Sequence, residues 1–297
     1  MKRLLRAAVA LALIGVAAFA WLTRPSHVDT AAFTGIVGDA QRGANVFWAG
    51  GCASCHVQEG VAGADPARPV LGGGHVLDTP FGRFVGPNIS PDPEHGIGRW
   101  TLAQFADAVQ RGVAPDGRHY YPVFPYTSYA RMTPQDVADL KAFMETLPTS
   151  GRASEPHALR FPWSVRRGIG LWKQRYLDTQ FVAAADGAQQ ERGRYLVEAL
   201  GHCAECHTPR DRFGGLDRTR WFAGAPNPAG TGDIPGLTPA TLQWSAGDIA
   251  YYLETGFDPS FDSVGGSMAE VVRNMGRLSA DDRAAIAAYV KALPASP

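Results

Sequence analysis

The sequence has no excess of charge of either sign. Its 297 residues contain 28 Lys and Arg against 28 Asp and Glu, so the formal net charge is zero. Proteins that bind nucleic acid usually carry a strongly basic domain or patch, and this balance speaks against that class. The apolar share of 45% is ordinary for a globular protein. The function must therefore be sought in individual motifs.

Cysteine is also scarce, and the four cysteines form two pairs. The segments "GCASCHV" (51–57) and "GHCAECHTPRD" (201–211) each contain a Cys-x-x-Cys-His motif. No cysteine lies outside these motifs, so none is left for a structural disulfide. The count indicates two equal sites.

Three kinds of site use a Cys-x-x-Cys pair. A zinc ribbon takes its ligands from pairs roughly 15–20 residues apart, whereas these pairs are separated by about half of the chain. A redox dithiol needs a strand before it and a helix after it, and gives no reason for the histidines. Covalent haem c explains every residue, because the thiols form thioethers and the imidazole binds the iron. We predict two haem c groups, attached at Cys52, Cys55, Cys203 and Cys206, with His56 and His207 as proximal ligands.

The surroundings of the two motifs repeat. "AQRGANVFWAGGCASCH" (40–56) resembles "QERGRYLVEALGHCAECH" (190–207), with Arg-Gly about ten residues before the first cysteine. Further along, "MTPQDVADLKAFMETLP" (132–148) aligns without gaps with "LSADDRAAIAAYVKALP" (278–294). Such a repeat predicts two copies of one domain.

The second repeated segment predicts an amphipathic helix in each copy. Thr133 and Ser279 are suitable N-caps, and acidic residues follow in the first turn. In a class I cytochrome c fold this helix crosses the helix before the motif. Gly43 or Gly193 would let an aromatic side chain approach closely at that crossing. The apolar stripes run at i, i+3, i+7 through Leu140, Phe143, Leu147 and through Ile286, Tyr289, Leu293.

The predicted fold is mainly α, with two tandem class I cytochrome c domains and an N-terminal hydrophobic helix. We expect a membrane anchor or signal peptide at 1–24, domain 1 at 35–148, a linker at 149–187 and domain 2 at 188–295. About 110 residues per domain are enough for a core when a haem fills the centre.

The linker and the loops have their own expectations. The linker is basic and contains two prolines and two tryptophans, so we expect it to pack across both domains, with a short helix near 164–176. The segments 57–100 and 208–243 are rich in Gly and Pro, and we expect irregular loops around the haems.

The N-terminus combines basic residues with an apolar run. Lys2, Arg3 and Arg6 precede sixteen uncharged residues (7–22), a length between a signal-peptide core and a membrane span. Ala18-Phe19-Ala20 would suit a cleavage site, but the bulky Trp21 follows it, and an uncleaved anchor is favoured. The charge bias keeps the N-terminus cytoplasmic and sends the domains into the bacterial periplasm.

The distal ligand separates electron carriers from haem enzymes. For haem 2 we expect Met268, in a Gly-rich loop before the last helix, in preference to Met275. For haem 1 we favour Met132, although it aligns with Leu278, a position typical of a hydrophobic staple. The alternatives are an open iron or a histidine, namely His75, His95 or His119.

The sequence resembles a known family in two long stretches. These are "VGPNISPDPEHGIGRWTLAQFADAVQRGVAPDGRHYYPVFPYTSYARMTPQDVADLKAFM" (85–144) and "GGSMAEVVRNMGRLSADDRAAIAAYV" (265–290). They are similar to the cytochrome c subunits of membrane-bound bacterial dehydrogenases that oxidise alcohols, gluconate, fructose or aldehydes. Many of those subunits carry three haems, and this chain has motifs for two. Many also read "AMPY" where this chain has "VFPY" (123–126), which puts Phe124 where their haem ligand often falls.

The resemblance implies an electron-transfer subunit without catalytic residues of its own. Electrons would come from a separate periplasmic dehydrogenase and leave for quinone or another cytochrome. No Rossmann glycine pattern, molybdenum ligand set or quinoprotein repeat is present in the sequence, so the dehydrogenase would be another chain. Two alternatives remain: a dihaem peroxidase-type enzyme with one open haem, and a soluble dihaem shuttle.

Overall fold

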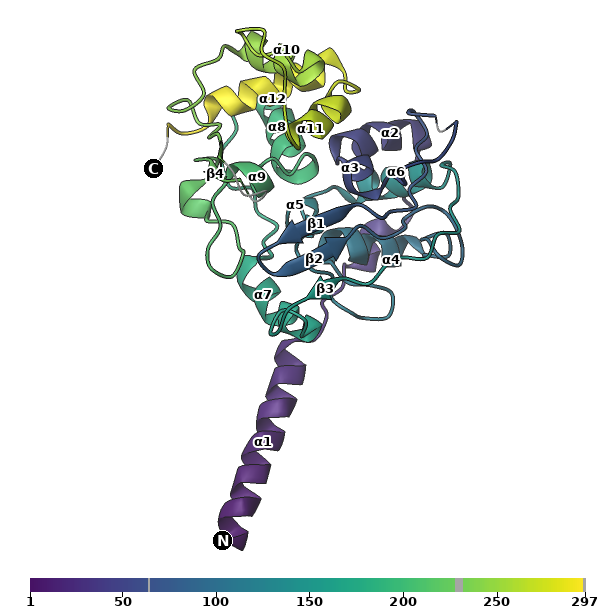
Figure 1. Cartoon of the computed structure of the whole chain (residues 1–297), viewed down its shortest axis with the longest axis vertical. Helices are drawn as coiled ribbons and strands as arrows, with labels where there is room; N and C mark the ends of the chain where they lie inside the picture. The colour runs from purple at the N-terminus through teal and green to yellow at the C-terminus, as the bar shows by residue number, and fades with distance from the viewer. Residues whose placement is uncertain (64, 228–231, 296–297) are drawn as a thin grey trace.

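The structure is a computed structural model that describes residues 1–63, 65–227 and 232–295. Figure 1 shows two helical domains side by side and a single helix, α1 (Lys2–Leu22), that projects alone from one end of the body. The prediction of a mainly helical, two-domain chain is thus confirmed. The chain reaches domain 1 through a short 3-10 helix, η1 (Thr30–Phe33).

Domain 1 is built around two helices that are far apart in the sequence. Its first helix, α2, packs against its last helix, α6. A Cβ atom on Gly43 would lie 1.9 Å from the carbonyl oxygen of Asp139, so only glycine allows this approach. The ring of Phe47 then meets that of Phe143 at 5.1 Å. The helices are α2 (Ala40–Ala49), α3 (Cys52–His56), α4 (Leu102–Ala106), the π-helical η2 (Asp107–Arg111), α5 (Tyr126–Tyr129) and α6 (Pro134–Met144).

Domain 2 repeats this crossing. A Cβ atom on Gly193 would lie 2.0 Å from the carbonyl oxygen of Ala285 and 2.7 Å from Cβ of Tyr289. The close approach of an aromatic residue to each glycine is therefore confirmed. The helices are α8 (Gly187–Arg194), the π-helical η4 (Tyr195–Leu200), α9 (Ala204–His207), η5 (Arg218–Arg220), α10 (Ala246–Thr255), α11 (Met268–Met275) and α12 (Ala280–Ala292).

The two copies differ by one residue between the glycine and the first cysteine. Gly43 lies nine positions before Cys52, and Gly193 lies ten before Cys203. Domain 2 absorbs the extra residue in the π-helical turn η4, where the Gly201 amide bonds to the Leu196 carbonyl, five residues back. The insertion therefore leaves both motifs in the same place relative to the helix crossing.

The N-caps of the last helices are as predicted. The Thr133 side chain accepts a hydrogen bond from the Asp136 amide, and the Ser279 side chain accepts one from the Asp282 amide, each at 3.1 Å. The caps fix where α6 and α12 begin, and hence which residues point toward the core.

The segments expected to be irregular loops contain short sheets, so that expectation is wrong in part. In domain 1 the antiparallel strands β1 (Val76–Thr79) and β2 (Gly82–Val85) pair from Val76 opposite Val85 to Thr79 opposite Gly82, and β3 (Ala158–Leu159) of the linker joins their edge. In domain 2, β4 (Ala225–Pro226) pairs with β5 (Asp233–Ile234). The strands are too short to show a clear two-residue alternation in the sequence.

The linker packs on both domains, as expected. It contains η3 (Arg166–Gly168) and α7 (Ile169–Tyr176), which matches the helix predicted near 164–176. Tyr121 of domain 1 donates to the Trp163 carbonyl at 3.0 Å, and Trp172 donates to the Phe213 carbonyl of domain 2 at 2.9 Å. The linker therefore joins the domains as a packed element.

The linker also holds the end of α1. Arg167 donates to the Ala20 carbonyl at 2.8 Å and to Oγ1 of Thr23 at 2.9 Å, and His119 of domain 1 donates from Nε2 to the Thr23 carbonyl at 2.8 Å. Thr23 is fully buried. These donors satisfy carbonyls that a helix end leaves without partners. We call these contacts the α1 clamp.

Candidate haem attachment sites

The first Cys-x-x-Cys-His motif forms the short helix α3, which starts after Gly51 in the left-handed region (φ 63°). The ring of His56 lies with Nδ1 2.8 Å from the Pro87 carbonyl oxygen. A carbonyl oxygen only accepts, so Nδ1 carries the proton and Nε2 keeps its lone pair. Burial lowers the pKa of His56, which also favours the neutral ring. His56 is thus held in the form that binds a metal through Nε2.

The second motif has the same geometry. His207 at the end of α9 places Nδ1 2.7 Å from the Pro235 carbonyl oxygen, and burial lowers its pKa as well. The main chain repeats too, because the carbonyl of His56 accepts from the Gly73 amide at 2.9 Å and that of His207 from the Gly224 amide at 2.8 Å. The two sites are copies in their supporting hydrogen bonds as well as in sequence.

The donor set suits covalent haem. Burial raises the pKa of the Cys52 and Cys203 thiols to about 12. A redox dithiol needs the opposite, a thiol whose pKa is lowered so that it reacts as thiolate. Among the residues the structure describes, no three His, Cys, Asp or Glu side chains gather as a cluster able to hold a metal ion. Each site instead offers two thiols on one turn of helix and an imidazole with a free Nε2, which fits a haem c.

The two sites lie against each other across the boundary between the domains. A Cβ atom on Gly51 would be 3.6 Å from Nε2 of His202, the residue before Cys203. The ring of His202 stands edge-on to that of Tyr129 at 5.8 Å, and the Tyr129 hydroxyl donates to the Gly50 carbonyl at 2.6 Å. Residues next to the first cysteine of each motif are therefore in contact.

Side-chain bonds from α11 and its C-terminal end hold this arrangement. Asn274 donates from Nδ2 to Oγ of Ser54, inside the first motif, at 2.8 Å. Arg277 places its guanidinium 4.0 Å from the centre of the Trp48 ring and donates to the Pro66 carbonyl at 2.9 Å. Asn274 is buried and Ser54 half-buried, so their bond is partly shielded from water. These contacts fix domain 2 to the attachment helix of domain 1.

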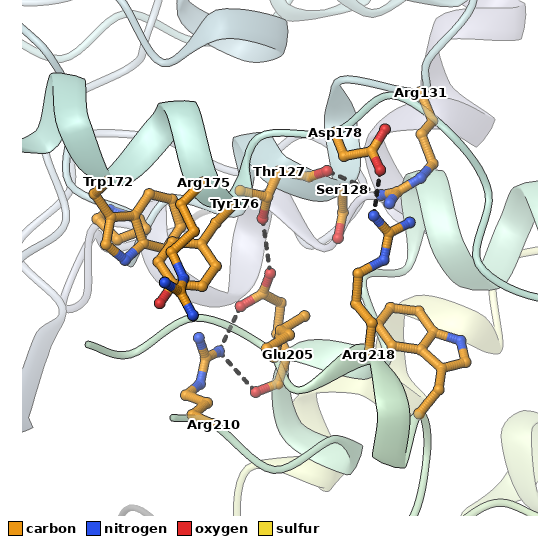
Figure 2. A pocket seen from close by; sticks show the side chains of 13 residues that line it. Thr127, Ser128, Arg131, Trp172, Arg175, Tyr176, Asp178, Glu205, Arg210 and Arg218 are labelled. Atoms are coloured by element: carbon orange, nitrogen blue, oxygen red, sulfur yellow. Dashed lines mark hydrogen bonds and ion pairs between the residues drawn. The ribbon is translucent and has the colours of Figure 1, made fainter. Parts of the chain in front are cut away.

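A pocket of about 100 Å³, lined by charged and aromatic side chains, lies at the junction of domain 1, α7 and domain 2 (Figure 2). Glu205, between the cysteines of the second motif, points into it and accepts from Oγ1 of Thr127 at 3.1 Å. Arg131 donates to the Thr127 carbonyl and to the Gln180 carbonyl, each at 2.9 Å. The pocket side chains thus tie α9 to α5, and the chain just after α5 to the linker.

The methionines occupy distinct places. Met268 is the first residue of α11, half-buried at the edge of the core, where a Gly-rich loop was expected. Met275 is buried, and its methyl group would lie 3.6 Å from a Cβ on Gly201, so it packs against the chain before the second motif. Met132 is buried just before an N-cap, as Leu278 is in domain 2. Met132 as a haem ligand therefore stays a prediction, and its position matches a packing residue.

The histidines considered for haem 1 lie elsewhere. His75 and His95 are exposed. His119 is buried and uses both ring nitrogens, Nε2 toward the Thr23 carbonyl and Nδ1 toward Nζ of Lys173 at 3.1 Å. Its ring is part of the α1 clamp. Phe124 lies in an aromatic group with Tyr120, Tyr126 and Tyr129.

Sequence reasoning missed the residues that join the sites. Tyr129, His202 and Asn274 belong to no motif, and their partners lie far away along the chain. The one available signal was that two polar residues next to the cysteines of the segment 201–211 are not used in haem attachment: Glu205, between the two cysteines, and His202, just before the first.

Comparison with known proteins agrees with this geometry. The cytochrome c family model matches residues 40–148 and 190–294. A diheme cytochrome c-type protein of Cereibacter sphaeroides is 57% identical over 99% of both chains. The fructose dehydrogenase cytochrome subunit of Gluconobacter japonicus is 35% identical, and the gluconate 2-dehydrogenase cytochrome c subunit of Pantoea cypripedii 34%, each over 86% of this chain. The chain spans 52% and 59% of the length of those two subunits.

Proposed function

The chain belongs to the cytochrome c family, and on this basis we propose that it is a dihaem electron-transfer subunit that takes electrons from a separate periplasmic dehydrogenase. It passes them to quinone or to another cytochrome of the respiratory chain. The observation that carries the proposal is the contact between the two attachment sites, from Gly51 to His202. Two one-electron centres held against each other suit a carrier.

The protein carries two covalently bound haem c groups, in line with the two family matches and the diheme relative. Each haem iron takes up and gives back one electron. We assign thioether attachment of the first haem to Cys52 and Cys55, and of the second to Cys203 and Cys206.

We assign the iron-binding nitrogen at each site to Nε2 of the histidine. The carbonyls of Pro87 and Pro235 hold the rings of His56 and His207 and increase the basicity of Nε2 through the Nδ1 hydrogen bonds. A fixed ring orientation keeps rearrangement small when the charge on the site changes.

The two haems differ in the residues proposed as their distal ligands. We assign Met268 to haem 2, because Met268 is the half-buried first residue of α11, a helix of domain 2. Met132 remains the proposed thioether for haem 1. A thioether favours ferrous iron and raises the potential, so the two haems would differ if only one has it.

The partner and the location are also proposed. Two of the relatives named above are cytochrome subunits of dehydrogenases, which supports a dehydrogenase partner here. Helix α1 has 21 residues and is long and apolar enough to cross a membrane. We propose that it anchors the protein to the inner membrane with both domains in the periplasm. The relatives give no support to the peroxidase-type alternative.

Haem content tests the assignment of the sites. Cys52→Ala and Cys203→Ala should each remove about one of two haems in a pyridine haemochrome assay on denatured protein. Asn274→Ala, which leaves all four thiols in place, is the matched control and should keep both haems. A cysteine variant that still holds two covalent haems would show that the sites are misassigned.

Co-purification from native membranes would identify the dehydrogenase. Reduction of both haems by the substrate of that dehydrogenase would test the electron transfer.

A further inference from the structure

We propose that the linker segment 160–175 rests on an anionic phospholipid surface and holds both domains in one orientation on the membrane. The inference builds on the proposed anchoring through α1 and adds a second, peripheral membrane contact. In Figure 1 the linker elements η3 and α7 lie at the end of the body from which α1 projects.

The α1 clamp sets the depth of this segment. Arg167 contacts the carbonyl of Ala20 and the side chain of Thr23, and a Cβ on Gly170 would lie 2.6 Å from Cα of Thr23. Gln174, one turn further along α7, donates to the Leu22 carbonyl. If α1 crosses the bilayer, its residues 20–23 lie at the membrane surface. Side chains that touch them must lie at the same level.

Apolar side chains of the segment face outward at this level. Phe161 is 81% exposed, Val165 47% and Leu171 42%. Leu171 lies between Arg167 and Gln174 at helical spacing, so it shares the face of α7 that touches α1. Exposed aromatic and aliphatic side chains beside a membrane helix are typical of residues that enter the headgroup region.

The charge of the segment suits anionic lipid. Four Arg residues and no acidic residue lie between Glu155 and Asp178, in a protein whose net charge is zero. The fifth basic residue of this stretch, Lys173, is buried and faces the protein interior. Arg160 is exposed. Arg175 is exposed too, but its side chain lines the pocket of Figure 2 and stacks on Tyr176. Basic residues at a membrane surface are attracted to anionic headgroups, and their apolar stems and aromatic neighbours enter the interface. The end of α1 adds Trp21, whose ring lies 5.2 Å from the Arg24 guanidinium.

A label at Phe161 tests this contact in the whole protein. The holoprotein Phe161→Cys carries a nitroxide there and is placed in nanodiscs of phosphatidylcholine with phosphatidylglycerol. The matched control is Phe261→Cys, because Phe261 is 77% exposed in the loop between α10 and α11. Figure 1 shows these two helices at the far end of the body from α1. Oxygen is concentrated in lipid and a nickel chelate in water. We therefore expect oxygen to increase the relaxation rate of the label at 161 severalfold more than the chelate does. At 261 the chelate should have the larger effect.

The charge is tested separately. Arg160→Gln should bring the label at 161 back toward water, as should nanodiscs of phosphatidylcholine alone. A label at 161 that is as accessible to the nickel chelate as the label at 261 would overturn the proposal. Protection that appears only when the dehydrogenase is added would overturn it too, since the surface would then dock a protein. The label reports depth and not reduction, so its failure would leave electron transfer untouched.

Discussion

Asn274 of domain 2 bonds through Nδ2 to Oγ of Ser54 of domain 1 at 2.8 Å, across 220 residues of sequence. We expect a double-mutant cycle with Asn274→Ala and Ser54→Ala to give a coupling of about 1 kcal/mol in the free energy of unfolding. Urea denaturation of the holoprotein measures it. Electron exchange between the haems, followed after flash reduction, should slow in both variants. Strictly additive single effects would mean that the bond does not hold the domains together.

The distal ligands can be read from the sulfur-to-iron charge-transfer band of the oxidised protein. Met268→Ala should remove this band from haem 2 and lower the potential of that haem, because a soft donor that favours ferrous iron is lost. The spectrum of haem 1 should stay unchanged.

Met132→Leu decides haem 1. If Met132 is its ligand, the variant loses the remaining band. If Met132 only packs, the variant keeps the spectrum and changes the free energy of unfolding by less than about 1.5 kcal/mol, since Leu278 fills the same place in domain 2. A wild-type spectrum with one thioether ligand that survives Met132→Leu would remove Met132 from the assignment.

The helix crossings should not tolerate a methyl group. Gly43→Ala and Gly193→Ala each place a Cβ at or below 2.0 Å from a carbonyl oxygen of the opposite helix. We expect each to lower the free energy of unfolding by about 2–3 kcal/mol, because the backbones must move apart. Gly151→Ala is the control, with no atom near its new Cβ. Equal melting temperatures for the three variants would contradict the crossing geometry.

Lys173 should make stability depend on pH. Burial lowers its pKa to about 7, against about 10.4 in an unfolded chain. Between these values the unfolded state binds more protons, so stability rises with pH from about 7 to 10 and levels off below pH 7. The ammonium faces His119, the carbonyls of Arg111 and Gly112, and the Tyr126 ring. Lys173→Met should lose this slope, and parallel pH profiles for the two proteins would contradict it.

The N-terminal helix should remain on the mature protein. We expect the wild type in the membrane fraction, and release when residues 1–19 are replaced by a cleavable signal, which keeps the bonds of Thr23 to His119 and Arg167. Edman sequencing that starts at Trp21 would show a cleaved signal peptide and contradict the anchor.

Local patterns predicted much of the fold. The caps at Thr133 and Ser279, the close approach at Gly43 and Gly193 and the linker helix follow from residue types at fixed spacing, and the structure has them. The hairpin of β1 and β2 did not follow, because four-residue strands carry too little periodicity.

The contact between the two sites could not be predicted from the sequence, for another reason. Tyr129, His202 and Asn274 are placed by how two folded domains dock, and no spacing along the chain encodes their meeting. Pro87 and Pro235, the partners of His56 and His207, could not be predicted either. Each contributes a main-chain carbonyl, which any residue type could supply.

The α1 clamp changes how the protein meets others. Domains joined to a membrane helix by a flexible linker can tilt freely above the membrane, so any part of their surface can meet a partner. Because the last turn of α1 is bonded to the linker and to His119, tilting the body requires tilting the helix in the lipid. The remaining freedom is lateral diffusion and spinning about the membrane normal. A partner anchored in the same membrane would therefore search in two dimensions and meet the two domains always at the same height.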